Sequence, residues 1–186
     1  MASRESSVDE QRVREEGSLF VDGLGELRVR SVAQSDRLAA PLIAELATEY
    51  SARYGGTRAE MLADLETYPA EEFASPHGAL LVLTIGDEPI AGGAFRQFDS
   101  GTAELKRIWT SNRYRRRGLG KIVVRELERV IAQRGYRKVY LTTGPRQPEA
   151  VALYLASGYT PLFDRNLTPD EIGVHPFEKV VEASNG

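Results

Sequence analysis

The stretch of sequence that decides the fold runs from Lys106 to Ile122 and reads KRIWTSNRYRRRGLGKI. It begins as a strand, continues as a polar loop, and reaches Gly118 and Gly120 where a helical pattern starts. A helix N-terminus has unpaired backbone N–H groups and about half a positive charge, so it attracts phosphate. Glycine lacks the Cβ atom that would keep a phosphate away from the backbone. Five cations surround this point: Arg113, Arg115, Arg116, Arg117 and Lys121. The stretch therefore predicts an anion site suited to a pyrophosphate.

Three competing assignments for this loop fit the sequence less well. In a Walker A motif a glycine would stand at Arg115, and a Ser or Thr in place of Ile122 would hold magnesium. A dinucleotide-binding fingerprint needs three spaced glycines, whereas two occur here. A solvated patch or an RNA-binding stripe would also collect arginines, but the chain as a whole has a formal net charge of -3. The pyrophosphate site is therefore the preferred interpretation.

Composition limits the kinds of site and partner that the chain can have. It contains no cysteine and two histidines, which excludes disulfides, thiolate metal sites and a Cys nucleophile and makes a His-based metal site or triad unexpected. A pI near 5.6 argues against nucleic acid or an anionic membrane as the main partner. The longest apolar stretch, Ala79 to Leu83, is far shorter than the ~20 residues of a membrane span. Because the N-terminus also lacks a signal-peptide pattern, we expect a cytoplasmic protein.

The chain length fits one domain that buries roughly 70% of its unfolded surface. We expect a flexible leader over residues 1–20, where apolar side chains are few, and a single domain over residues 21–183. Strands are expected at 25–32, 79–85, 90–98, 102–110, 138–143 and 174–181, with a further one possible at 159–163. Helices are expected from the capping residues Ser35 and Asp36 to Gly55, at 57–68 behind a Thr57–Glu60 capping box, at 118–134, and at 148–157. This order indicates a mixed α/β fold.

Two segments, Arg115 to Gly120 and Leu153 to Tyr159, stand in the order and at the distance seen in a known family. The first matches Arg/Gln-x-x-Gly-x-Gly/Ala between a strand and a helix, and the second matches Leu-Tyr-x-x-x-Gly-Tyr/Phe. Over about residues 75–180 the chain resembles the GNAT superfamily of N-acetyltransferases, of bacterial type. The resemblance implies the GNAT fold: a mostly antiparallel sheet of six to seven strands with a splay between the fourth and fifth, flanked by about four helices.

The resemblance also implies acetyl-CoA as cosubstrate and no metal. In the family the pantetheine arm enters the splay and pairs with the backbone of the fourth strand, which here corresponds to Ile108, Trp109 and Thr110. The pyrophosphate would bind the segment Arg115, Arg116, Arg117, Gly118, Leu119, Gly120 and Lys121. Trp109 could equally be a packing aromatic on an alternating strand. Many relatives have an Asn after the fifth strand, and Gln147 takes its place here as a cofactor contact with a longer amide.

Acetyl transfer to an amine requires a group that accepts the amine proton and a proton for the departing thiolate. The resemblance points to Tyr154 as the general acid, although it could instead be a core tyrosine beside Val151 and Leu155. Glu104 matches the position of a catalytic glutamate, but it could simply pair with Lys106 or Arg107. Alternation along this strand would place residues 104, 106, 108 and 110 on one face. Without a side-chain oxyanion donor, a backbone N–H near Ile108 would polarise the thioester carbonyl.

The acceptor is expected to be a primary amine of a small molecule, bound near residues 45–68 and 163–175. A rim of aromatic and cationic residues could hold a carboxylate-bearing molecule or be ordinary helix surface: Tyr50, Arg53, Tyr54, Arg58 and Tyr68. Two other functions stay open, a protein lysine or N-terminal acetyltransferase and a non-catalytic acyl-CoA-binding regulator. We expect no nucleic acid or membrane partner, and a homodimer is possible.

Overall fold

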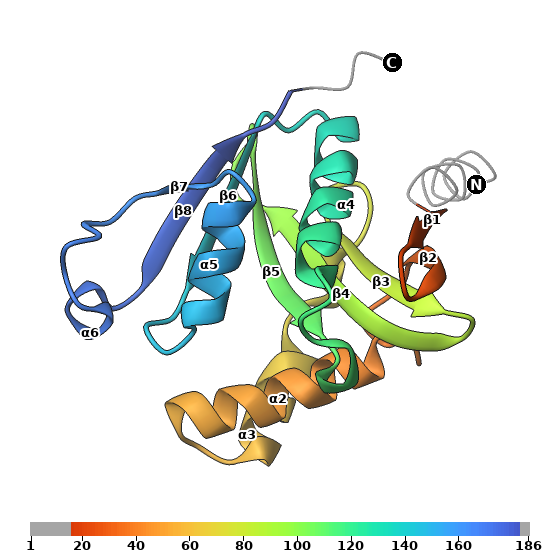
Figure 1. The fold of residues 1–186 in the computed structure, drawn as a ribbon, viewed down its shortest axis with the longest axis horizontal. Helices are drawn as coiled ribbons and strands as arrows, with labels where there is room; N and C mark the ends of the chain where they lie inside the picture. The colour runs from red at the N-terminus through yellow and green to blue at the C-terminus, as the bar shows by residue number, and fades with distance from the viewer. Residues whose placement is uncertain (1–15, 183–186) are drawn as a thin grey trace.

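A computed structural model describes residues 16–182, and its centre is an eight-stranded sheet in the order β1-β2-β3-β4-β5-β6-β8-β7 (Figure 1). The strands are β1 (Gly17–Val21), β2 (Gly25–Ser31), β3 (Ala79–Ile85), β4 (Glu88–Gln97), β5 (Thr102–Thr110), β6 (Lys138–Thr143), β7 (Thr160–Pro161) and β8 (His175–Val180). The α-helices are α2 (Ala40–Tyr54), α3 (Arg58–Thr67), α4 (Leu119–Gln133), α5 (Pro148–Ala156) and α6 (Pro169–Ile172), and short 3-10 turns stand at Ala70–Phe73 and Asn112–Tyr114. Neighbouring strands are antiparallel except β5 and β6.

Helices cover both faces of the sheet, so the central strands are apolar on both sides. On one face the buried side of α4, which includes Val123 and Leu127, packs with Leu81 of β3. On the other face Leu42 of α2 packs with Val82 of β3. Because successive strand residues point to opposite faces, β3 must be apolar at nearly every position, and it is buried along almost its whole length.

The parallel pair β5–β6 stays together for three residue pairs only, from Thr102↔Lys138 to Glu104↔Tyr140. Beyond this point the strands diverge, and Figure 1 shows the gap widening toward α2. The splay expected from the family resemblance is therefore present. The sheet has eight strands, one more than the six to seven that were expected. The extra strand, β1, forms a hairpin with β2 and includes residues 17–20 of the predicted leader. The rest of that leader lies largely outside the described residues.

The elements differ from the prediction most clearly at α2, at residues 159–163 and at α6. Asp36 does not cap α2, because its carboxylate accepts the Leu38 N–H at 2.8 Å in a preceding turn and the helix starts at Ala40. The possible strand at 159–163 is reduced to two residues, and α6 was not predicted. The Thr57–Glu60 capping box of α3 is confirmed.

A bulge in β5 changes the side-chain alternation that the sequence suggested. Arg107 has a positive φ of 59°, and the register with β4 shifts between Gly92 and Ala94. As a result Leu105 and Ile108 both pack in the α4 core, although simple alternation would place them on opposite faces, and Trp109 lies in the α2 core. The expectation that residues 104, 106, 108 and 110 share one face is wrong, because the bulge adds one residue to the strand.

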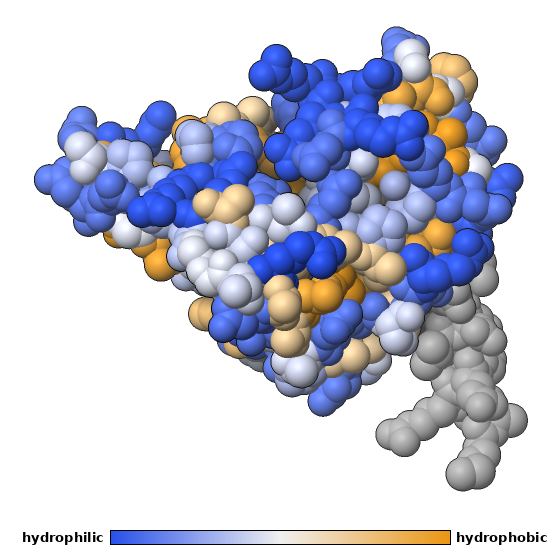
Figure 2. Space-filling view, turned by 90° about the horizontal axis from the view of Figure 1, so that it is seen from below, coloured by the Kyte–Doolittle hydropathy of each residue, from blue (hydrophilic) through white to orange (hydrophobic). Residues whose placement is uncertain are grey.

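The surface at the α2–α3 end is mostly hydrophilic, with apolar side chains gathered in small patches (Figure 2). This agrees with α3, in which none of the ten residues is buried. Within residues 16–182, no helix is both long enough and apolar enough to cross a bilayer.

Leu127 is fully buried between α4 and the sheet. Replacing it with alanine leaves a cavity, so we expect Leu127→Ala to lower the free energy of unfolding by about 2–5 kcal/mol in chemical denaturation. Arg125→Ala, on the exposed side of the same helix, should change it by less than about 0.5 kcal/mol. Equal effects of the two substitutions would contradict this packing of α4.

Candidate active site

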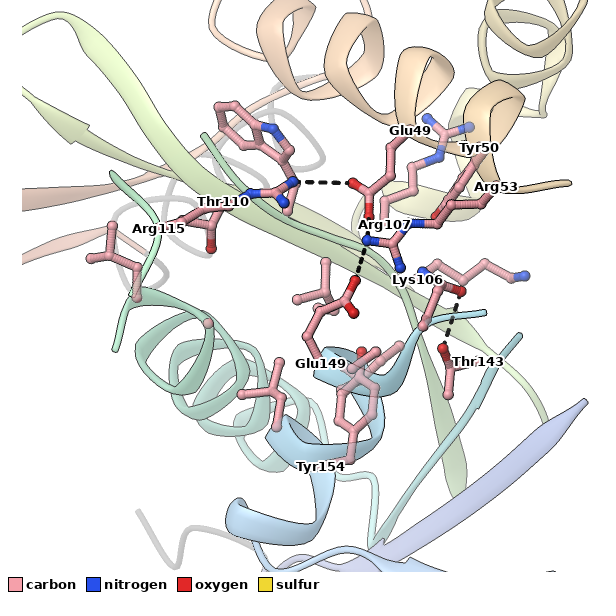
Figure 3. A pocket seen from close by; sticks show the side chains of 18 of the residues that line it. Glu49, Tyr50, Arg53, Lys106, Arg107, Thr110, Arg115, Thr143, Glu149 and Tyr154 are labelled. Atoms are coloured by element: carbon pink, nitrogen blue, oxygen red, sulfur yellow. Dashed lines mark hydrogen bonds and ion pairs between the residues drawn. The ribbon is translucent and has the colours of Figure 1, made fainter. Parts of the chain in front are cut away.

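A cavity of about 540 Å³ lies between the diverging strands β5 and β6, next to the start of α4 (Figure 3). Its lining residues come from five places in the chain: α2, β5, the loop and first turn of α4, the end of β6, and α5. Ten of the predicted site residues line it: Ile108, Trp109, Thr110, Arg115, Arg116, Gly118, Leu119, Gly120, Gln147 and Tyr154. Arg117, Lys121 and Glu104 are not among the lining residues.

The loop before α4 is built by backbone conformations that side chains rarely adopt. Gly118 is the N-cap of α4 with a left-handed φ of 75°, and no atom outside its neighbours lies within 4 Å of where its Cβ would be. Arg116 also has a positive φ, of 63°. Gly120 lines the cavity and also has a packing role that was not predicted. A Cβ at this position would stand 3.2 Å from Leu153, so Gly120 allows α5 to pack closely against the first turn of α4.

Two tyrosine rings reach the cavity from opposite sides, Tyr50 from α2 and Tyr154 from α5 (Figure 3). No hydrogen bond of either hydroxyl occurs within the described part of the chain. Burial, with a smaller contribution from the neighbouring Tyr50, raises the pKa of Tyr154 above its ordinary value. Burial likewise raises the pKa of Tyr50 to about 12, against the lowering effect of the Arg107 charge. Both phenols therefore stay protonated at neutral pH and can donate a hydrogen bond.

The ring of Tyr154 is held by other aromatic rings. The centroids of Tyr159 and Phe177 each lie 5.7 Å from it, in edge and tilted arrangements. Tyr159 donates a 2.8 Å hydrogen bond to Glu128 of α4, so its hydroxyl is occupied. Tyr154 is thus both a core aromatic and a cavity-lining phenol, which combines the two roles considered from the sequence.

Gln147 has a structural role that the sequence did not reveal. Its side-chain oxygen accepts hydrogen bonds from the Thr143 hydroxyl, the Gly144 N–H and the Tyr54 hydroxyl, each at 3.1 Å. These contacts fix the loop between β6 and α5 and join it to the end of α2. The amide oxygen is therefore engaged by the protein itself, which leaves the amide NH₂ as the group that could contact a cofactor.

Arg53 connects α2 to α5 across the cavity. Its guanidinium pairs with Glu49 at 3.0 Å and with Glu149, and it donates to the Arg146 carbonyl at 2.8 Å (Figure 3). Arg146 returns a 2.8 Å hydrogen bond to the Arg53 carbonyl. We call the contacts of Arg53 and Tyr54 with Arg146, Gln147 and Glu149 the α2–α5 clasp. Because the partners are 93 residues apart in sequence, no local pattern could have predicted it.

Glu49 also reaches the loop before α4, where its second oxygen lies 3.5 Å from Arg115. Trp109 has its ring buried under α2 and donates from Nε1 to Glu45 at 2.8 Å, so the packing role considered for it is present although it also lines the cavity. Helix α2 therefore contacts the cavity through a row of polar side chains.

Glu104 stands just before the strands diverge and is buried. One oxygen accepts from Arg96 Nε at 2.8 Å, and the other lies 3.6 Å from Lys106 Nζ. The pairing with Lys106 is one that the sequence had suggested as an alternative to a catalytic role. Lys106 lines the cavity and Glu104 does not, so any contact of this carboxylate with a substrate would have to pass through water.

Comparisons with solved structures support this architecture. A putative acyl-CoA N-acyltransferase from Klebsiella pneumoniae is 24% identical, with a TM-score of 0.62 over 82% of this chain and 96% of that one. The GNAT domain of S. lividans PAT is 18% identical, with a TM-score of 0.65 over 90% of this chain and 98% of that domain. A ribosomal L7/L12 alpha-N-protein acetyltransferase in complex with coenzyme A is 14% identical, with a TM-score of 0.62 over 90% of this chain and 100% of that chain. At these identities the likeness shows the fold.

A search of functionally curated proteins finds no match. The model of the acetyltransferase (GNAT) family matches residues 39–159, from the residue before α2 to the third residue after α5. The match therefore includes the phosphate loop, the splay and Tyr154. Because this match spans well over half of the chain, the protein belongs to the GNAT family of acetyltransferases.

Proposed function

We propose that the protein transfers the acetyl group of acetyl-CoA to a primary amine of a small molecule, by direct transfer in a ternary complex. The observation that carries this proposal is the single cavity that joins the loop at Arg115 to Tyr154 between two strands that have separated. A location in the cytoplasm and a homodimeric state stay predictions.

The residues present suit coenzyme A. Arg115 and Arg116 line the cavity where α4 begins, and the first amides of this helix are free to bind a pyrophosphate. From Leu105 to Thr110, β5 pairs with β4 on one side, and no described strand pairs with its other edge. That open edge offers backbone N–H and C=O groups to the amides of a pantetheine arm. When bound, acetyl-CoA supplies the acetyl thioester.

Tyr154 is the proposed general acid. In the transfer the amine nitrogen forms a bond to the acetyl carbon, the C–S bond breaks, and the sulfur takes a proton from the phenol. The raised pKa means that the phenol still carries its proton when the sulfur leaves. Glu104 is the proposed base and would accept the amine proton through ordered water beside Lys106. The backbone N–H near Ile108, next to the bulge, is the proposed donor to the carbonyl oxygen.

The α2–α5 clasp favours a small acceptor over a protein. A polypeptide substrate needs an open groove beside the thioester, whereas here Arg53 and Tyr54 bridge to the β6–α5 loop across the cavity. A non-catalytic acyl-CoA-binding regulator would need the loop at Arg115 but no hydroxyl at position 154. Loss of turnover in a variant that still binds cofactor therefore separates an enzyme from a regulator.

We expect Tyr154→Phe to lower kcat by about 100-fold or more while the Kd for acetyl-CoA stays within about twofold of wild type. Because the acid works when protonated and its pKa is raised, wild-type kcat should show no alkaline loss from Tyr154 below about pH 10. Thiol-release kinetics from pH 6 to pH 10 measure both effects. The matched control is Tyr140→Phe on β6, outside the cavity, which should retain activity. If Tyr154→Phe turns over as fast as wild type, Tyr154 is not the general acid.

Arg115→Ala should weaken binding of coenzyme A about tenfold, because it removes a charge-assisted contact to phosphate. Isothermal titration calorimetry at two salt concentrations measures the affinity and its electrostatic part. Arg113→Ala is the control, since Arg113 is exposed and pairs with Glu88. If both variants bind coenzyme A as wild type does, the phosphates lie elsewhere.

Glu104→Gln should lower kcat on the order of 100-fold if Glu104 is the base. Glu72→Gln is a matched control, because Glu72 also pairs with Arg96 but lies outside the cavity. Steady-state kinetics with thermal denaturation of both variants separates catalysis from folding. Equal, small losses of kcat would assign Glu104 a purely structural role.

A further inference from the structure

Arg107, one of the residues that line the cavity, carries a buried positive charge. Arg107 is 7% exposed, and its guanidinium donates to the Gln34 side-chain oxygen at 2.9 Å and the Leu65 carbonyl at 2.6 Å. It lies 4.8 Å from the centroid of the Phe73 ring. Across residues 16–182 no carboxylate pairs with it. A buried charge without an opposite charge is costly, so a ligand anion nearby would be favoured.

Lys106, the next residue, adds a second cation that is only loosely paired. Its ammonium lies 3.6 Å from Glu104, whose other oxygen is held more closely by Arg96 at 2.8 Å. Arg96 also pairs with Glu72. Three cations, Arg96, Lys106 and Arg107, thus face two carboxylates, which leaves one positive charge in excess. Lys106 is the member that both lines the cavity and keeps part of its side chain accessible.

The carboxylates that line the cavity cannot supply that missing charge, since each is already engaged. Glu49 pairs with Arg53 and Arg115, and Glu149 pairs with Arg53. An acceptor with several ammonium groups would therefore meet no uncommitted carboxylate among the lining residues. Tyr50 presents a hydroxyl to this cavity from α2 and can donate a hydrogen bond to an anion (Figure 3).

We propose that the acceptor is an amine that also carries a carboxylate, and that Lys106 and the Tyr50 hydroxyl bind this carboxylate. The inference rests on the proposed function and names the substrate class of the same site. One excess positive charge matches a carboxylate better than a phosphate group, which carries close to two negative charges at neutral pH. Lys106 is then a specificity-determining residue, with Arg107 supplying a fixed positive field behind it.

The test measures thiol release from acetyl-CoA with matched acceptors. Each α-amino acid is compared with its amide and its decarboxylated amine, and spermidine and an aminoglycoside represent polycations. We expect kcat/KM to be at least about tenfold higher for the best amino acid than for its amide or decarboxylated amine. Lys106→Met and Tyr50→Phe should reduce this ratio by raising KM for the carboxylate form, while Lys106→Arg should keep most of it. The matched control is Lys138→Met, which changes a partly exposed lysine of β6 that pairs with Glu178 and should leave the ratio unchanged.

Two results would overturn the inference and leave the proposed function intact. One is a preference of the wild-type protein for polycations or for decarboxylated amines. The other is that Lys106→Met lowers kcat/KM equally for acceptors with and without a carboxylate, while the circular dichroism spectrum of the variant matches that of wild type. If no amine in the panel releases thiol, the proposed function itself fails and the inference falls with it.

Discussion

The separation of β5 from β6 after three residue pairs is the constraint on which the rest of the site depends. A parallel pair that continued would satisfy the backbone groups of both strands and leave no space between them. By parting, the strands expose one edge of β5 and create a cavity inside a sheet that is otherwise continuous. Because hydrogen bonds between β5 and β6 no longer hold this region together, elements on both faces of the sheet must stabilise it.

Two elements provide this stabilisation. On one face α4 starts at the wide end of the gap, and its N-terminal turn packs against α5 through Gly120 and Leu153. On the other face the α2–α5 clasp ties the end of α2 to the β6–α5 loop through Arg53, Tyr54 and Gln147. In the proposed function, the side chains that stabilise the open strands would also limit how large an acceptor can enter.

Much of the donor side could be predicted from the sequence, since its signals are local. The loop from Arg115 to Gly120 is contiguous, and the pattern Leu-Tyr-x-x-x-Gly-Tyr places Tyr154 two residues before the end of α5. The contacts on the α2 side of the cavity could not be predicted, because they join α2 to a loop more than ninety residues away in sequence. The faces of β5 were mispredicted for a related reason. The bulge at Arg107 depends on the register with β4, which alternation within one strand does not contain.

The contact between Gly120 and Leu153 has a mechanical consequence. Leu153 is adjacent to Tyr154, so the turn that would receive phosphate and the helix that carries the phenol pack closely, and a Cβ on Gly120 would stand 3.2 Å from Leu153. Helices α4 and α5 therefore cannot shift relative to each other at this point without changing the contact between Gly120 and Leu153. The position of the Tyr154 ring relative to the first turn of α4 is thus set by direct packing of the two helices.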